Sequence, residues 1–299
     1  MDQLLNDLRQ FAETETDTPL STMTTLRIGG KAKYTVYPET EIALDGIIRM
    51  IRKAGMPFKI FGKGSNILCS DMDYDGAIIR LDRHFNDFYF KDETVTAQAG
   101  CSIITLSYEA MKKGLSGLEF ANGIPATVGG VCYMNAGAYK CSMSDVIDSL
   151  FVYRDEKFEW IPSSECEYAY RTSIFQKHLD WIILAVRMHL EKKDPAEITA
   201  RMNDRRQRRL STQPLDYPSC GSVFRNPENM NAWKLIDGIG YRGKRLGGAM
   251  VSPKHPNFII NSDHASGSDF LNLCNDIQRK VYEKYGIQLY MEVEKFNWQ

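Results

Sequence analysis

Two glycine-rich segments are the first places where this chain could bind an anion. Gly62–Asn66 directly follows an apolar run, and glycines there let backbone N–H groups turn towards a diphosphate, with Ser65 and Asn66 adding polar contacts. The spacing is not that of a dinucleotide-binding fingerprint, because Ile67 stands where the third glycine would be, and it is not that of a Walker A loop. An ordinary tight turn would leave the same pattern.

The second glycine-rich segment runs from Gly123 to Gly130 and is followed by Asn135–Ala138. Two such segments in one domain could let the backbone approach one large ligand from two sides. Two unrelated loops are the alternative interpretation.

Three further polar side chains are candidates for binding or catalysis. Arg171 follows Tyr170 near a predicted buried strand, where its planar fork suits a carboxylate or phosphate, although a structural salt bridge is the commoner role. Ser222 is flanked by small residues without the G-x-S-x-G elbow of hydrolases, so it is a candidate proton donor. Glu292 lies in residues 289–294, which we predict as a strand, and such a glutamate would ordinarily face solvent.

The cysteines and the overall charge exclude several classes of protein. Seven cysteines are scattered with no C-x-x-C pair, which argues against a metal site or a dithiol redox centre. We expect free thiols in a reducing compartment, and we expect Cys220 to be inert because no histidine stands near it. The formal net charge is -1 and the basic run Arg205–Arg209 lacks interleaved aromatics, so nucleic acid is not an expected partner. That run fits a solvated helix face or a diphosphate contact.

The N-terminal residues indicate where the protein works. Met1–Asp17 is acidic and lacks a long apolar run, so we expect no signal peptide, and nowhere does the chain carry the roughly 18 apolar residues of a membrane span. These features predict a cytoplasmic protein with no membrane partner. The sequence does not indicate an oligomeric state.

The elements that must position these residues alternate between strands and helices. Residues 3–13 have the pattern of an amphipathic helix, and the chain from Lys33 onwards alternates predicted strands and helices, with a hairpin around Arg154–Lys157. Asp194 and Pro195 are suited to begin a helix at the junction between two domains. We therefore expect an N-terminal helical arm over 1–17, a domain over 18–191 and a second domain over 200–299.

Eight segments, taken together and in this order, resemble the family of UDP-N-acetylenolpyruvoylglucosamine reductases, the MurB family. They are Thr24–Ala32, Gly62–Asn66, Ala99–Phe120, Gly123–Tyr139, Ala169–Phe175, Gln213–Pro227, Ala232–Asn261 and Tyr285–Glu294. The resemblance covers about residues 20–295, and the chain lacks the long insertion after the Tyr-Arg motif, as in the shorter class of the family.

The resemblance implies an α+β fold with a two-part FAD-binding domain of the vanillyl-alcohol-oxidase (PCMH) type and a C-terminal α+β substrate domain. It implies an FAD-dependent reductase that converts the enolpyruvyl ether of UDP-N-acetylglucosamine to UDP-N-acetylmuramate for peptidoglycan synthesis. NADPH passes a hydride to the flavin, the reduced flavin passes a hydride to C3 of the substrate, and a proton reaches C2. The implied small-molecule partners are the UDP-sugar and NADPH.

The resemblance also implies roles for individual residues. Arg171 and Glu292 would hold the substrate carboxylate as it becomes enolate-like, with the glutamate carrying or sharing a proton, and Ser222 would donate the proton to C2. The residues implied at the flavin are Gly62, Lys63, Gly64, Ser65, Asn66, Gly123, Ile124, Gly129, Gly130, Asn135 and Gly137. Those implied at the substrate are Asn226, Arg242 and His255, and for His255 a surface histidine is an equal alternative.

Two other functions fit the same fold. One is an FAD-dependent alcohol oxidase, under which the set Arg171, Ser222 and Glu292 is hard to explain. The other is a non-catalytic flavin or nucleotide-sugar sensor, to which Glu294 gives some room, because the family usually has an arginine there.

Overall fold

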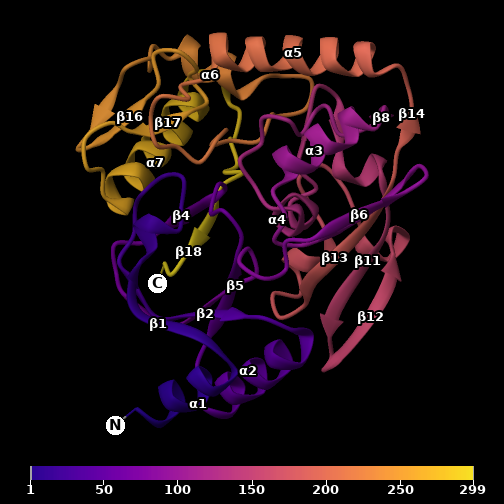
Figure 1. Ribbon diagram of the computed structural model, residues 1–299. Coiled ribbons are helices and arrows are strands. Elements are labelled where there is room, and N and C mark those ends of the chain that lie inside the picture. Colours follow the sequence, from indigo (N-terminus) through magenta and orange to yellow (C-terminus); the bar gives the residue numbers. More distant parts are fainter. Residues whose placement is uncertain (1, 299) are drawn as a thin grey trace. The chain divides into compact units, whose positions relative to one another are not determined.

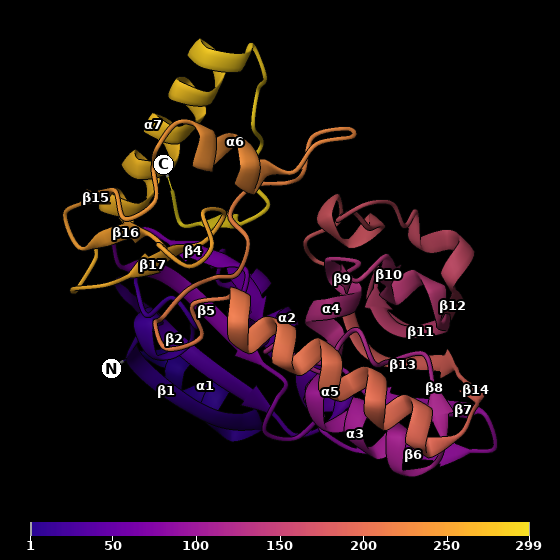
Figure 2. The same ribbon diagram turned by 90° about the horizontal axis from the view of Figure 1, so that it is seen from above.

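The computed structural model describes residues 2–298, which fold as two compact units (Figures 1 and 2). Unit 1 consists of the described residues up to Thr16, Tyr34–Lys63 and Asp75–Arg208. Unit 2 consists of Asp17–Lys33, Gly64–Tyr74 and the described residues from Arg209 onwards. Two stretches from the first quarter of the chain therefore belong to the same unit as its C-terminal part, and the expected domain limits at 191 and 200 stay a prediction.

The regular elements of residues 2–298 mix helices and strands. The α-helices are α1 (Gln3–Phe11), α2 (Glu41–Lys53), α3 (Ile103–Lys112), α4 (Val128–Tyr133), α5 (Pro195–Thr212), α6 (Ala232–Gly238) and α7 (Gly267–Tyr285). Short 3-10 turns are η1 (Leu20–Thr22), η2 (Met143–Asp145), η3 (Ser163–Cys166) and η4 (Ile174–Gln176). Helix α5 begins at Pro195, as predicted, and Asp194 Oδ1 accepts the N–H of Ala196 at 2.9 Å, because the first helical amides lack partners inside the helix.

One sheet of five strands lies wholly in unit 1, in the order β12-β11-β13-β7-β6. Its strands are β6 (Phe88–Lys91), β7 (Thr94–Gln98), β11 (Ile147–Arg154), β12 (Lys157–Pro162) and β13 (Ile182–His189). Arg154 pairs with Lys157 across the antiparallel β11–β12 hairpin, which confirms the predicted hairpin.

A four-stranded sheet has the order β1-β2-β5-β3. Its strands are β1 (Ala12–Pro19), β2 (Lys31–Pro38), β3 (Phe58–Phe61) and β5 (Tyr74–Arg80). Smaller strands in unit 1 form the pairs β8 (Leu115–Ser116) with β14 (Glu191–Lys192) and β9 (Gly137–Ala138) with β10 (Cys141–Ser142).

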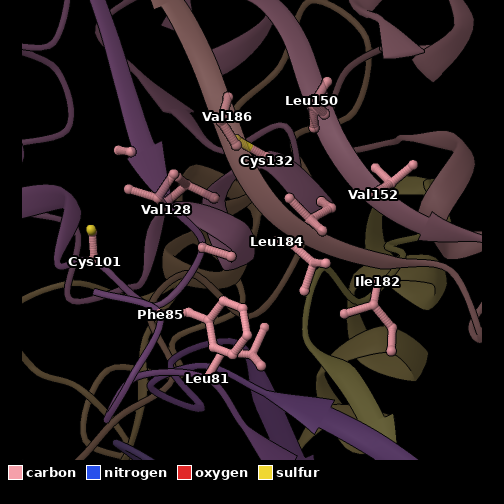
Figure 3. Close-up of a cluster of buried hydrophobic side chains, with 14 of the residues drawn as sticks. Leu81, Phe85, Cys101, Val128, Cys132, Leu150, Val152, Ile182, Leu184 and Val186 are labelled. Carbon is pink, nitrogen blue, oxygen red and sulfur yellow. The ribbon is translucent and has the colours of Figure 1, made fainter. Parts of the chain in front are cut away.

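The core of unit 1 joins these sheets to the helices that cover them. Figure 3 shows Val128 and Cys132 of α4 among side chains of β11 and β13, such as Leu150 and Val186. These side chains are almost fully buried, and burying each aliphatic side chain contributes roughly 1.5–3 kcal/mol. Helix α4 is thereby held in place by the core of unit 1, and so is the glycine-rich segment that leads into it.

The N-terminal helix is shorter than predicted. Helix α1 ends at Phe11 and not at residue 13, because β1 begins at Ala12 with a strand-like alternation of burial. Ala12 and Thr14 point inwards, while Glu13 and Glu15 both pair with Arg83 of unit 1. The tertiary contacts of this acidic stretch override the helical pattern.

Unit 2 packs α6 and α7 on small sheets. The order β15-β16-β17 describes strands β15 (Arg245–Leu246), β16 (Ala249–Val251) and β17 (Ile259–Asn261), and β4 (Ile67–Cys69) pairs in parallel with β18 (Glu294–Phe296). The buried faces of α6 and α7 join one core with Leu26, Leu68 and Phe224. Helix α7 starts with a capping box of Ser266 and Asp269 and ends at Gly286 with a φ of 65°.

The predicted strand over residues 289–294 is wrong for most of its length. Only Glu294 belongs to a strand, and Met291 makes an isolated bridge to Phe224. This stretch makes only two main-chain bonds to residues 223–225, and the carbonyls of Leu289 and Glu292 accept from the side chains of Gln278 and Asn66 instead. Such pairings leave no two-residue period in the sequence. No helix within residues 2–298 is long and apolar enough to cross a membrane.

Candidate functional site

Gly62, the first residue of the first glycine-rich segment, contacts the second segment within unit 1. A Cβ atom added to Gly62 would lie 2.4 Å from Oγ1 of Thr127, the residue before α4, so only a glycine fits against that threonine. Thr127 is the N-cap of α4, and its Oγ1 accepts the N–H of Gly130 at 3.3 Å. The structure therefore joins Gly62 to the Gly123–Gly130 segment, which favours one shared ligand over two unrelated loops.

Glycine is also required at the start of α4. A Cβ on Gly129 would lie 2.9 Å from that of Ala99, whereas one on Gly130 would meet only Thr127 Oγ1, at 3.3 Å. Gly123, Ile124 and Gly130 are half-buried. The segment thus packs tightly on one side while Gly130 keeps an open side.

The loop Gly62–Asn66 carries amides suited to an anion. The N–H groups of Lys63, Gly64 and Ser65 make no hydrogen bond within residues 2–298, although Gly64 is a buried residue. Gly64 has a φ of 61°, and a Cβ there would lie 2.3 Å from the carbonyl oxygen of Met23. Consecutive unused amides in a left-handed turn bind phosphate oxygens well, so the loop fits the diphosphate of the FAD implied by the resemblance.

The side chain of Lys63 is held by an acidic residue. Its Nζ lies 3.3 Å from Oδ2 of Asp82. The same carboxylate accepts from Arg80, at Oδ1 from Nε and at Oδ2 from Nη2. Burial alone would raise the pKa of Asp82, but the hydrogen bonds and charges of Arg80 and Lys63 outweigh burial and lower that pKa. Asp82 therefore stays ionised and fixes the lysine beside the loop.

Arg171 lies in unit 1 against the β9–β10 hairpin. It has a left-handed φ of 56°, and its Nη2 donates to the carbonyl oxygen of Gly137 at 2.6 Å, with a longer contact of 3.4 Å from Nη1 to that of Asn135. The guanidinium carbon lies 5.1 Å from the centre of the Tyr170 ring. The structure thus brings together three of the predicted site residues, Asn135, Gly137 and Arg171, through two carbonyl groups that accept from the guanidinium.

The side chain of Asn135 serves the fold. This asparagine is 4% exposed, its Nδ2 donates to the carbonyl of Ala169 at 3.0 Å, and its Oδ1 accepts the N–H of Ser144 at 3.0 Å. These bonds tie the turn that carries Arg171 to the hairpin that receives it. A direct flavin contact through the Asn135 side chain stays a prediction.

Ser222 lies in unit 2, at the start of a stretch that is bonded along both edges. It is half-buried, and its hydroxyl makes no hydrogen bond to any of the described residues. The next residue, Val223, donates its N–H to the carbonyl of Asn257 at 2.8 Å and accepts the N–H of Glu292 at 2.8 Å. The main chain beside Ser222 is therefore fixed, while its hydroxyl remains able to bond to a ligand.

Glu292 is the other predicted catalytic residue of unit 2. Its N–H bonds to Val223 and its carbonyl accepts from Nδ2 of Asn66 at 3.1 Å. The structure accordingly brings Glu292 next to the Ser222 segment and links both to the end of the glycine loop. The N–H of Glu294 adds a second bond to Asn66, at 2.9 Å.

Asn226 and Arg242 are exposed and bonded to their own unit. Oδ1 of Asn226 accepts the N–H of Ala232, the first residue of α6, at 3.0 Å. Arg242 makes a bidentate pair with Asp237 and donates to the carbonyl oxygen of Pro253 at 2.8 Å. Both residues stabilise local turns, and their substrate contacts stay predictions.

His255 is half-buried and has a defined hydrogen bond. Its Nδ1 accepts the N–H of Asn257 at 3.2 Å, and its ring lies 4.8 Å from that of Phe258 in an edge-on arrangement. Burial, and next the charge of Arg242, lower the pKa of His255, which favours the neutral ring that Nδ1 needs in order to accept. His255 is not a solvated surface histidine.

The cysteines and acidic residues add no further chemistry. All seven cysteines are free, and burial raises the pKa of Cys220 to about 12, which makes its thiol a poor nucleophile. Within the described part of the chain, no cluster of three or more histidine, cysteine, aspartate or glutamate residues could hold a metal ion.

Three residues of these sites were not singled out from the sequence: Thr127, Asp82 and Asn257. Thr127 had a signal, because a threonine directly before a short apolar run is a typical helix N-cap. Asn257 bonds to Phe224 and Asp82 bonds to Lys63 as well as to the nearby Arg80, and no local sequence pattern marks either role.

Two family descriptions match the chain. Residues 32–156 match the "FAD binding domain" family, and residues 213–296 match "UDP-N-acetylenolpyruvoylglucosamine reductase, C-terminal domain". The first match contains both glycine-rich segments, and the second contains Ser222 and Glu292.

Several curated relatives are similar along nearly their whole length. UDP-N-acetylenolpyruvoylglucosamine reductases of Anoxybacillus flavithermus and Thermotoga maritima are each 40% identical over 92% of this chain, covering 91% and 96% of those proteins. The Bacillus subtilis reductase is 36% identical over 98% of both chains.

Solved structures agree in fold. The UDP-N-acetylenolpyruvylglucosamine reductase (MurB) of Thermus caldophilus superposes with a TM-score of 0.80 and 34% identity, over 95% of this chain and 98% of that one. A Physcomitrella patens BBE-like 1 protein shares the fold over 64% of this chain and 44% of its own, with a TM-score of 0.50 and 13% identity. The predicted α+β fold with an FAD-binding domain and a reductase C-terminal domain is confirmed, as is the resemblance stated from the sequence. From the similarity along nearly the whole chain and the match of its C-terminal part, it follows that this chain belongs to the family of UDP-N-acetylenolpyruvoylglucosamine reductases.

Proposed function

We propose that this chain reduces the enolpyruvyl ether of UDP-N-acetylglucosamine to UDP-N-acetylmuramate with NADPH, through residues Arg171, Ser222 and Glu292. Membership of the family supports the reductase over the alcohol oxidase and the sensor. The observation that carries the assignment to residues is Ser222, whose hydroxyl has no partner within residues 2–298 while the adjacent main chain is bonded on both sides.

FAD, when bound, takes electrons from NADPH and supplies them to the double bond of the substrate. The chain binds the FAD diphosphate with the amides of Lys63, Gly64 and Ser65, and the side chains of Ser65 and Asn66 line the same loop. The backbone approaches the cofactor closely at Gly62, Gly123, Ile124, Gly129 and Gly130. At Gly62 and Gly129 a larger residue would also collide with Thr127 and Ala99, which would move this backbone.

The protein's own residues stabilise the charge that develops at C2 and in the carboxylate. Arg171 and Glu292 hold this carboxylate, and Ser222 gives its proton to C2. A fixed serine is effective because a proton donor must be within about 3 Å of the carbon that it protonates. Asn226, Arg242 and His255 contribute to the surface that receives the UDP-sugar.

We place the protein in the cytoplasm, where NADPH and nucleotide sugars are available. The seven free thiols are consistent with a reducing compartment. The UDP-sugar and NADPH are its small-molecule partners.

Anaerobic absorption spectroscopy tests the function. The purified protein with FAD should be yellow, NADPH should bleach it, and the enolpyruvyl UDP-sugar should restore the colour without oxygen. A protein that binds no FAD, or whose reduced form is reoxidised by oxygen but not by the UDP-sugar, would contradict the proposal.

A further inference from the structure

Asn257 is hydrogen-bonded to the main chain directly after Ser222. It is 5% exposed, and its Oδ1 accepts the N–H of Phe224 at 3.0 Å while its Nδ2 donates to the carbonyl of the same residue at 2.8 Å. Its main-chain carbonyl accepts the N–H of Val223 at 2.8 Å. Asn257 therefore supplies hydrogen bonds to the main chain of two consecutive residues, Val223 and Phe224, as a neighbouring strand would.

The opposite edge of the same stretch is bonded as well. Glu292 donates its N–H to the carbonyl of Val223 at 2.8 Å, and Arg225 donates its own to that of Tyr290 at 2.9 Å. Ser222 precedes this fixed stretch and follows Gly221, a glycine with a φ of 78° and no neighbour within 4 Å of an added Cβ. Ser219 is held by a bridge to Ile260, but Gly221 lies between it and Ser222, so the residues bonded directly beside Ser222 are Val223 and Phe224.

Asn257 is itself held in place by a compact turn. Its N–H donates to Nδ1 of His255, and the buried Oγ of Ser252 accepts the N–H groups of Lys254 and His255 at 3.1 and 3.3 Å. Ser252 and Phe258 close the turn with a main-chain bond of 2.8 Å. The neutral ring of His255 is thus part of the support for Asn257.

We propose that Asn257 is a positioning residue for proton transfer, which aims the Ser222 hydroxyl by fixing the main chain at Val223 and Phe224. The proposal rests on the proposed function, in which Ser222 donates the proton to C2. Displacing a reacting group by about 1 Å can slow a reaction by about 10²-fold, so the two side-chain bonds of Asn257 suffice for a large effect.

The test measures both half-reactions of Asn257→Ala by anaerobic stopped flow. Flavin reduction by NADPH should stay within about two-fold of the wild type, because no proton from Ser222 is needed in that step. Reoxidation by the enolpyruvyl UDP-sugar should slow by about 10-fold or more. Asn257→Asp keeps the acceptor for the Phe224 N–H and should slow reoxidation less, and it serves if the alanine variant does not fold.

Asn261→Ala is the matched control in the same unit. The Asn261 side chain also bonds to the main chain: its Nδ2 donates to the carbonyl of Leu26 at 3.2 Å, and its Oδ1 accepts the N–H of Ala265 at 2.8 Å. Among the described residues, it makes no bond to Val223 or Phe224. Its removal should lower stability while leaving the ratio of the two half-reactions unchanged.

A double-mutant cycle with Ser222→Ala separates positioning from a general structural role. Where the hydroxyl is already absent, adding Asn257→Ala should change reoxidation by less than about two-fold, because misplacing a missing group costs nothing. A full additional slowing in the Ser222→Ala background, or equal slowing of both half-reactions, would overturn the role of Asn257. If wild-type enzyme is not reoxidised by the UDP-sugar at all, the proposed function fails first and this role fails with it.

Discussion

Replacing Gly62 by alanine tests the cradle formed by the two glycine-rich segments. The added Cβ would lie 2.4 Å from Oγ1 of Thr127, about 1 Å closer than the shortest ordinary contact of 3.4 Å. The Cβ and Cγ2 atoms of the threonine are at an ordinary 3.5 Å, so rotating its side chain would relieve the clash only by taking Oγ1 away from the N–H of Gly130. Either Thr127 gives up its cap of α4, or the loop moves away from it.

The magnitude follows from these two outcomes. Losing an N-cap hydrogen bond costs about 1 kcal/mol, and forcing an extra carbon into a packed site costs about 1–3 kcal/mol. We expect the free energy of unfolding to fall by about 2–4 kcal/mol. If half of that strain is expressed in the complex, FAD binds about 5- to 30-fold more weakly.

Urea denaturation of the FAD-free protein and the quenching of flavin fluorescence on binding measure the two quantities. A cycle with Thr127→Ala isolates the contact, because Gly62→Ala should cost clearly less when Oγ1 is already gone. Equal costs in both backgrounds, or unchanged stability and unchanged FAD affinity, would refute the contact and with it the shared cradle.

Three further predictions concern the catalytic serine, a buried carboxylate and pH. Ser222→Ala should leave flavin reduction by NADPH nearly intact and slow reoxidation by the UDP-sugar by about 10²-fold or more, measured by stopped flow, and equal loss in both steps would argue against a proton donor. Glu119 is 5% exposed and accepts from Ser116 Oγ at 2.7 Å and from the N–H of Gly117 at 2.8 Å, so Glu119→Ala should lower the free energy of unfolding by about 2–4 kcal/mol, whereas a change under about 0.5 kcal/mol in urea denaturation would show that these bonds do not matter. The pKa of His255 is lowered by burial and by Arg242, so the unfolded chain binds a proton near pH 6 that the folded chain does not. Neutral His255 therefore contributes fully to the free energy of unfolding above about pH 6.5, and this contribution is lost as the pH falls through the pKa of the folded state. Between pH 7.5 and 5 the wild type should lose more of its free energy of unfolding than His255→Asn, measured by urea denaturation. Identical losses would contradict this.

The sequence predicted those parts of the fold that depend on local patterns. The hairpin around Arg154–Lys157 has a two-residue turn, and α5 begins at Pro195 after Asp194, as turn and capping preferences indicate. The end of α1 and the backbone around Glu292 were predicted wrongly, because distant partners such as Arg83 and Asn66 decide them.

The same distinction applies to the candidate site. The resemblance implies the roles of Arg171, Ser222 and Glu292, whereas the spacing of residues does not predict the hydrogen bonds that hold them in place. Tyr139 and Lys140 form the tip of the β9–β10 hairpin with left-handed φ values of 56° and 64°. Such a turn usually contains glycine or asparagine, and neither stands here, so the sequence does not predict it. Asn257 supports a segment more than thirty residues earlier through side-chain bonds to its backbone.

A crystal structure of the protein with FAD and the enolpyruvyl UDP-sugar tests the central claim most directly. We expect Ser222 Oγ to lie about 3 Å from C2, with Arg171 and Glu292 on the substrate carboxylate. A complex in which these three side chains lie apart, or in which the hydroxyl points away from the substrate, would contradict it.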